Sequence, residues 1–282
     1  MNLQPLFDHH AGVVSRAQLR ASGATDAMIR RAVADREVRR LRRGWFAAPG
    51  ANDDVSRAVT AGGVASCLTA LALAGVWVPY DPRVHTRRTR RHRAKRPAAG
   101  LVACDPPERR TTSAPQAVDD VQTALATAAW CQTSEHLTVL LDSALHKGLV
   151  TRDDLEALFA DAPRRIRRAL DSADGLAEAG TETLVRLRLR RRGVALRAQV
   201  WIGNRRVDFL VGRSLIIEVD GRAWHDDPEA FERDRERDRA LAALGYRVVR
   251  LTYRQVIDDW PAVERDLLAI IRRGDHLRAP ER

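Results

Sequence analysis

Acidic residues interrupt two apolar runs of this sequence that otherwise have the pattern of buried strands. Asp208 lies within the run RRVDFLV, Glu218 and Asp220 lie within SLIIEVD, and His225 follows shortly after. Strands that only build a core avoid acids, because burying an unpaired carboxylate is costly. Carboxylates that gather at one place repel each other unless a cation lies between them. Oxygen ligands without thiolates are typical of Mg²⁺ or Mn²⁺, which polarise phosphoryl oxygens and activate bound water.

Two short turns predict how the strands that carry these acids pair. Residues 203–204 fit a two-residue hairpin loop, and residues 212–214 fit a three-residue loop. The predicted cross-strand pairs are Ile202 with Arg205, Gln199 with Asp208, Val211 with Leu215, Asp208 with Glu218, and Arg206 with Asp220. The opposite face is predicted to carry Ala198, Val200, Val207, Phe209, Leu215, Ile217 and Val219. Because cross-strand partners share a face, we expect the acids to form one row, with Gln199 as an orienting group.

Helices are predicted on either side of these three strands. The segment TETLVRLRLRRRG (residues 181–193) has a threonine cap, strong helix formers and a terminal glycine, which favour a helix over a strand. Glu182 then shares a helix face with Val185 and Leu189, so it points inward. A second helix is predicted over residues 227–245, and a fourth strand, YRVVRLTY, follows it.

Two alternatives stay open for this set of residues. Arg206, Arg222 and Arg237 offer ion pairs that would neutralise the acids without a metal. His225 either takes a proton from water or hydrogen-bonds a phosphate, or it is a loop histidine without a role.

The order helix, three antiparallel strands, helix, strand resembles the PD-(D/E)XK nuclease superfamily. The residues that carry the resemblance are Glu182, Asp208, Glu218-Val219-Asp220 and His225. The segments VDF, IIEVDG, WH and GYRVVRLT are similar to the branch that resembles very-short-patch-repair endonucleases. The resemblance implies an Mg²⁺- or Mn²⁺-dependent nuclease whose metal is held by Asp208, Glu218 and the Val219 carbonyl, with help from Glu182.

One position departs from the superfamily pattern. Asp220 stands where the superfamily usually has a lysine, so the cation that would orient the attacking water is missing. The resemblance places a catalytic histidine at His225, and either His225 or Asp220 would then handle the proton. A non-catalytic DNA-binding regulator with a degenerate nuclease fold is the alternative.

The first fifty residues predict a small helical unit with a basic hairpin. Helices begin after the N-caps Ser15 and Thr25 and are separated by a turn at Gly23, which is helix-turn-helix spacing. The segment VRRLRRGWFAAPG then turns at residues 43–44, as a two-stranded wing would. The predicted DNA-contacting residues are Arg30 and Arg31 on the second helix and Arg39, Arg40, Arg42 and Arg43 on the wing. A helical bundle with a solvated basic face is the alternative.

This region also resembles the N-terminal winged-helix domain of AbiEi-type antitoxins. The segment GGVASCLTALALAGVW (residues 62–77), expected to be a helix, resembles the segment that follows that domain. The resemblance implies a transcription-regulator-like module, and a homodimer or a cognate partner protein is left open.

The formal charge of +11 points to a nucleic-acid partner, DNA first with RNA not excluded. All basic residues except Lys95 and Lys147 are arginines, which suit phosphate contacts but also reflect a GC-rich genome. Residues 83–96 hold eight Arg or Lys in fourteen positions, which predicts either a strand or loop that contacts phosphates or a solvated linker. The sequence has no transmembrane or signal-peptide pattern, so we expect a cytoplasmic protein without a membrane partner.

The cysteines complete the expectation. Cys67, Cys104 and Cys131 are isolated in the sequence, without a CxxC pair, which argues against a zinc site or a disulfide framework. His136 and His146 are expected at the surface or packed, not as ligands.

The predicted fold class is α+β: a winged helix-turn-helix at 1–50, a mostly helical middle at 51–175, and a nuclease-like α/β mixed sheet at 176–282.

Overall fold

A computed structural model describes residues 3–88, 92, 96–106, 115–220, 236 and 239–278 of the chain. The chain divides into two compact units, Met1–Leu170 and Asp171–Arg282, and both combine helices with strands. The predicted α+β fold class is therefore confirmed. Three domains were expected, whereas the structure groups residues 1–50 with the middle region in one unit. No helix within the described ranges has the length and apolar character that a membrane span needs.

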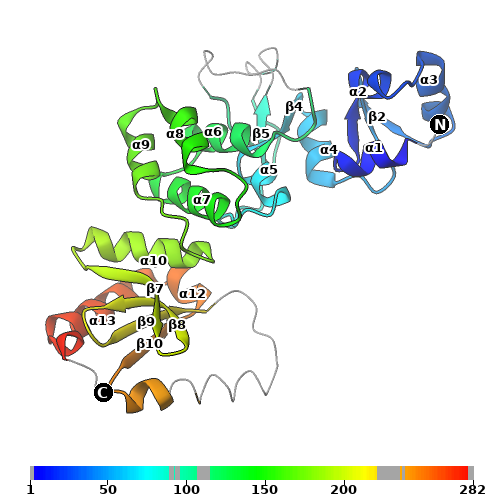
Figure 1. Ribbon diagram of the computed structural model, residues 1–282. Coiled ribbons are helices and arrows are strands. Elements are labelled where there is room, and N and C mark those ends of the chain that lie inside the picture. Colours follow the sequence, from blue (N-terminus) through cyan, green and yellow to red (C-terminus); the bar gives the residue numbers. More distant parts are fainter. Residues whose placement is uncertain are drawn as a thin grey trace. The chain divides into compact units, whose positions relative to one another are not determined.

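The N-terminal part of the first unit contains the helices and the hairpin that the sequence predicts (Figure 1). Its elements are α1 (Gln4–His9), β1 (Val13–Ser15), α2 (Arg16–Ala21), α3 (Asp26–Ala34), β2 (Arg39–Arg42) and β3 (Trp45–Ala47). The side chains of Ser15 and Thr25 accept hydrogen bonds from backbone N–H groups of the helices they precede, so both predicted N-caps are confirmed. β3 lies between β1 and β2 in an antiparallel sheet. The core of this part includes Phe7, Leu19, Ile29 and Phe46.

The middle of the first unit contains a small sheet that the sequence analysis did not anticipate. Its elements are α4 (Asp53–Thr60), β4 (Gly63–Ala65), α5 (Cys67–Leu73), β5 (Val84–Arg88), β6 (Leu101–Ala103), α6 (Val121–Cys131), α7 (Ser134–His146), α8 (Arg152–Phe159) and α9 (Arg164–Asp171). β5 is the central strand, antiparallel to β4 and parallel to β6. Of the helix expected over 62–77, only α5 forms. Its start is displaced because Gly62 has a φ of 89° and the backbone at Gly63 closely approaches that of Arg87, where an added Cβ would lie 2.9 Å from the carbonyl oxygen.

The basic segment 83–96 contributes the central strand of this sheet. Arg87 is buried, and its guanidinium bonds both carboxylate oxygens of Asp119, at 2.6 and 2.7 Å. Arg88 forms an ion pair with Asp105, with Nε 2.9 Å from Oδ2. The expectation of a solvated linker is therefore wrong for residues 84–88, because acids from neighbouring elements neutralise these arginines. Residues 89–91 and 93–95 lie outside the described residues.

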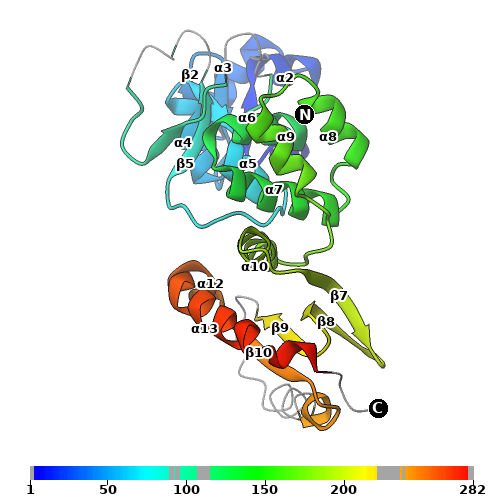
Figure 2. The same ribbon diagram turned by 90° about the vertical axis from the view of Figure 1, so that its left-hand side faces the viewer.

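The second unit is a four-stranded mixed sheet with helices around it (Figure 2). Its elements are α10 (Gly180–Arg191), β7 (Leu196–Ile202), β8 (Arg205–Val211), β9 (Leu215–Val219), β10 (Arg247–Leu251), α12 (Tyr253–Ile257), α13 (Trp260–Arg272) and the short 3₁₀ helix η3 (Asp275–Leu277). The strand order is β10-β9-β8-β7, antiparallel except for the parallel pair β9–β10. The predicted helix at 181–193 and the predicted fourth strand are confirmed.

The predicted registers of the hairpins are also confirmed, with Ile202 opposite Arg205 and Val211 opposite Leu215. Gly212 fixes the second turn because its φ is 61°, which an L side chain rarely adopts. A Cβ at Gly212 would lie 2.5 Å from the carbonyl oxygen of His276, which accepts the Arg213 N–H at 2.7 Å. This turn therefore sets the register of the two strands that carry the acids.

Candidate active site and other functional surfaces

β8 and β9 end their backbone pairing at the position of the acids. The last antiparallel pair is Phe209–Ile217, and the same register next brings Asp208 opposite Glu218. The backbone N–H of Val219 donates to Oδ2 of Asp208 at 2.8 Å. The Asp208 carboxylate therefore lies against the backbone of the residue that follows Glu218. Glu218 is buried, whereas Asp208 and Asp220 are half-buried.

Glu182 and Gln199 connect α10 with β7. Glu182 is buried, as its helix face predicts, and its carboxylate accepts the Ala179 N–H and the side-chain amide of Gln199, both at 2.9 Å. Gln199 has a φ of 52°, a left-handed conformation that costs about 1–3 kcal/mol for a residue of this type. It is skipped in the β7–β8 ladder, although the pairs on both sides keep the register that puts it opposite Asp208. Strained residues of this kind cluster at functional sites.

Arg250 supplies a cation that the sequence analysis missed. β10 runs parallel to β9 and brings Arg250 beside Glu218. Its guanidinium nitrogens lie 3.5 Å from a Glu218 oxygen and 3.7 Å from an Asp220 oxygen. The expected neutralising arginines were others: Arg206 forms an ion pair with Glu178, while Arg222 and Arg237 lie outside the described residues. Only the parallel register of β10, which the sequence does not encode locally, identifies Arg250.

The division of the sheet into one polar and one apolar face is incomplete. Leu210 lies two residues after Asp208, and Ile216 lies two residues before Glu218, so both share the face of the acids. Both are nevertheless buried, and they pack with Val207 and Leu241 in one core cluster. Leu241 comes from residues 239–243, the helical residues at the end of the predicted helix over 227–245. The start of that helix and His225 lie outside the described residues. The face that carries the acids is therefore partly apolar.

A family model for restriction-endonuclease-like domains, REase_MTES_1575, matches residues 182–271. The C-terminal unit carries a nuclease-like domain. The matched segment begins at Glu182 and contains both acidic strands. The chain is also similar to the catalytic domain of the homing endonuclease I-Bth0305I, with 21% identity and a TM-score of 0.31 over 35% of this chain and 97% of that domain.

No curated protein matches the sequence significantly. The comparisons give no support to the resemblance of the N-terminal region to AbiEi-type antitoxins.

Arginines from α3 and the hairpin gather around one hollow of about 630 Å³ in the first unit. It is lined by Arg16, Asp26, Ile29, Arg30, Val33, Arg40, Arg43, Gly44 and Phe46. Arg30, Arg40 and Arg43 are exposed and belong to the predicted DNA-contacting set. Arg16 was missed by the sequence analysis, and it forms an ion pair with Asp26 across the hollow's rim.

The other predicted DNA-contacting arginines have different surroundings. Arg31 forms an i,i+4 ion pair with Asp35. Arg42 is half-buried: its guanidinium lies over the Trp45 ring at 5.2 Å and donates to the Gly63 carbonyl at 3.4 Å. Burial lowers the pKa of Arg42 from its ordinary value. Arg42 therefore joins the hairpin to the neighbouring sheet.

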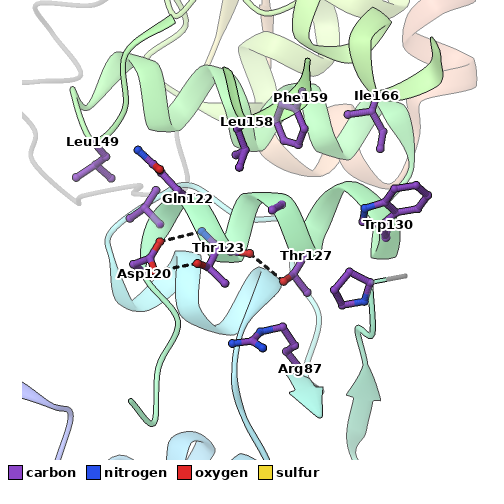
Figure 3. A pocket seen from close by; sticks show the side chains of 13 residues that line it. Arg87, Asp120, Gln122, Thr123, Thr127, Trp130, Leu149, Leu158, Phe159 and Ile166 are labelled. Atoms are coloured by element: carbon purple, nitrogen blue, oxygen red, sulfur yellow. Dashed lines mark hydrogen bonds between the residues drawn. The ribbon is translucent and has the colours of Figure 1, made fainter. Parts of the chain in front are cut away.

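A second pocket of the first unit, of about 740 Å³, lies between α6, α8 and α9 (Figure 3). Side chains of Trp130, Leu158, Phe159 and Ile166 line it. Asp120, also on its wall, caps α6 by accepting hydrogen bonds from the backbone and hydroxyl of Thr123, both at 2.8 Å. We assign no chemistry to this pocket, because Asp120 serves the start of a helix.

The three cysteines, isolated in the sequence, meet in space. Cys67, Cys104 and Cys131 gather around His85, and the four ligand atoms all lie within 4.8 Å of one another. It is the one such cluster found among the described residues. Burial raises the pKa of the Cys67 thiol. The cysteines are isolated only along the chain, so the lack of a CxxC pair did not reveal that they lie together in space.

Proposed function

We propose that the C-terminal unit is a divalent-metal-dependent nuclease that hydrolyses phosphodiester bonds of DNA. One observation carries the proposal. The Asp208 carboxylate is bonded to the backbone of Val219 beside the buried Glu218, within a segment that the restriction-endonuclease-like family model matches. Two acids side by side on adjacent strands need a compensating positive charge, and a phosphodiester substrate adds negative charge to the same place.

The residues at this place fit Mg²⁺ or Mn²⁺. Such ions are held by one or two carboxylates and keep several waters, so Asp208 and Glu218, with the Val219 carbonyl, suffice as a donor set. Asp208 Oδ2 is engaged by the Val219 N–H, which fixes the orientation of the carboxylate. When bound, the ion would supply electrophilic stabilisation of the phosphate and lower the pKa of a bound water.

The surrounding residues have positioning roles in this proposal. Glu182 would add a further negative charge near the metal, and its carboxylate accepts a hydrogen bond from the Gln199 amide. Arg250, shared by Glu218 and Asp220, supplies the positive charge that Asp220 does not supply at the usual lysine position. The proton of the attacking water passes to Asp220 or to His225.

The N-terminal helices and hairpin would bind the DNA as a winged helix. Arg30 on α3 and Arg40 and Arg43 on the hairpin line one hollow, so a recognition helix and a wing can contact the same duplex segment. Arg42 contributes to the position of the wing through Trp45 and Gly63. RNA presents the same phosphates and is the alternative substrate.

The test is DNA cleavage by the purified full-length chain in Mg²⁺ or Mn²⁺. We expect Asp208→Asn and Glu218→Gln each to lower the rate about a thousandfold or more, the scale seen when a central catalytic group is lost. Asp266→Asn, which changes an exposed acid of α13, is the matched control and should cut at the wild-type rate. Equal cleavage by wild type and Asp208→Asn would contradict the proposal.

A non-catalytic DNA-binding regulator is the second candidate, and the ion pairs of Arg250 favour it. Arg250 already offsets charge on Glu218 and Asp220, so the acids can be tolerated without a metal. Calorimetric titration with Mn²⁺ separates the two. Binding that Glu218→Ala removes supports the nuclease, and absence of binding supports the regulator. Both candidates bind DNA through phosphate contacts, so affinity should fall steeply with salt.

A further inference from the structure

The cluster of Cys67, His85, Cys104 and Cys131 lies within the first unit, apart from the carboxylates of the proposed nuclease. Each ligand comes from a different part of the fold. Cys67 begins α5, His85 lies on the central strand β5, Cys104 directly follows β6, and Cys131 ends α6. Between 17 and 26 residues separate successive members in the sequence. Topology therefore brings these groups together, and no local turn motif does.

The four ligand atoms are close enough together to share one ion. Nδ1 of His85 lies 3.2 Å from the Cys104 sulfur and 3.7 Å from the Cys131 sulfur, and the two sulfurs are 2.7 Å apart. Ligand atoms of a tetrahedral zinc site lie about 3.5–3.8 Å apart. The distance from His85 to Cys131 already has this value, whereas the sulfurs of Cys104 and Cys131 would have to separate by about 1 Å to hold the ion. A disulfide requires about 2.05 Å between sulfurs, and all three cysteines are free.

Hydrogen bonds around His85 select the tautomer that a metal needs. Nε2 of His85 lies 3.2 Å from Oδ2 of Asp81, and Arg83 bonds the same carboxylate at 2.7 Å. A carboxylate paired with a guanidinium is a hydrogen-bond acceptor only. The ring proton then lies on Nε2, and the lone pair of Nδ1 points at the sulfurs. Metal-ligating histidines commonly have this carboxylate partner.

The sulfur atoms have a second donor beside them. The side-chain amide of Gln132 lies 3.5 Å from the Cys67 sulfur and 3.6 Å from the Cys131 sulfur. An N–H donor stabilises thiolates, the form that binds a metal. Cys67 also has a φ of 48°, and this strained conformation presents its sulfur to the cluster.

We propose that Cys67, His85, Cys104 and Cys131 bind one Zn²⁺ ion in a closed, structural site. Three sulfurs and one imidazole nitrogen form the Cys₃His set of structural zinc sites, in which no position is left for substrate. Cys67, His85 and Cys104 are almost fully buried, which fits a structural ion. The ion would tie β5 and the end of β6 to α5 and α6.

The test is the metal content of the full-length chain, purified with a phosphine reductant and without chelators, by inductively coupled plasma mass spectrometry. We expect one zinc per chain in the wild type and in Asp208→Asn, and less than a tenth of that in Cys104→Ser. His85→Ala should lose the zinc, while His146→Ala, the control at an exposed histidine of α7, should keep it. Because Asp208→Asn separates the two metal sites, failure of the zinc proposal leaves the nuclease proposal standing.

Cobalt substitution of the wild type keeps the proposal falsifiable even where a cysteine variant does not fold. Tetrahedral thiolate coordination should give sulfur-to-cobalt charge-transfer bands that one equivalent of zinc removes. Reduced wild-type protein without stoichiometric zinc, an octahedral cobalt spectrum, or an intact mass that shows a disulfide between Cys104 and Cys131 would overturn the assignment.

Discussion

The two groups of potential metal ligands in this chain differ in nearly every physical property. The carboxylates of Asp208 and Glu218 are hard ligands on a sheet, and Asp208 is only half-buried. Their charge is already offset by a backbone N–H and by Arg250. The cluster around His85 consists of soft ligands that are almost all buried. Its neighbour Asp81 orients the His85 ring and does not supply the positive charge that an ion would bring.

This difference is the one expected between a catalytic metal site and a structural metal site. A hard site with its own compensating charges stays folded when its ion leaves, so the ion can exchange and meet a substrate. A closed thiolate site exists only in the folded state, so its binding free energy contributes to folding. We therefore expect removal of metal to have unequal effects on the two units.

The largest expected effect concerns chelation. Stripping metal with a strong chelator should lower amide protection in β4, α5 and β5 by a hundredfold or more, which corresponds to about 2.7 kcal/mol. Protection in β8 and β9 should stay within a factor of about three, because Arg250 and the Val219 N–H remain. Hydrogen exchange of the full-length chain with mass spectrometry measures both at once. Equal loss of protection in both sheets would break the comparison.

The next effect concerns Asp81, which contacts no sulfur but orients His85. Asp81→Asn keeps the shape and removes the anionic acceptor, so we expect zinc affinity to fall tenfold to a hundredfold. Competition with a chromophoric chelator gives the affinity. Asp54→Asn is the matched control, because Asp54 is an exposed acid that also pairs with an arginine. If Asp81→Asn binds zinc as tightly as the wild type, the hydrogen bond between Asp81 and His85 has no role in zinc binding.

The contrast between the two groups also explains what the sequence could predict. The acids were recognisable because they break the apolar pattern of strands, and the loops at 203–204 and 212–214 fix their register through local turn geometry. The N-caps Ser15 and Thr25 were recognisable for the same local reason. Local rules act over a few residues, so these parts of the fold and the site were predictable.

The cysteine cluster and Arg250 depend on long-range pairing that no local pattern contains. Cys104 reaches His85 because β6 pairs in parallel with β5, and Arg250 reaches Glu218 because β10 pairs in parallel with β9. Parallel partners need crossover connections, whose register is set by packing and not by a turn. The sheet that contains β5 was missed for the same reason, since a strand rich in arginine becomes buried only when Asp119 and Asp105 are in place.

The smallest expected effect tests whether the carboxylate row tolerates metal loss because of Arg250. Arg250→Met keeps the aliphatic stem but leaves Glu218 and Asp220 without their shared guanidinium. We expect the free energy of unfolding to fall by about 1–2 kcal/mol, and saturating Mn²⁺ to restore part of it because the ion replaces the lost charge. Denaturant titration with and without Mn²⁺ gives both values.

Arg254→Met is the control for Arg250, since Arg254 is exposed and its pairing with Asp258 is worth little. It should change stability by less than about 0.5 kcal/mol in either condition. If Mn²⁺ stabilises the wild type and Arg250→Met equally, the guanidinium and the ion do not share a role. The row would then hold its metal independently of Arg250.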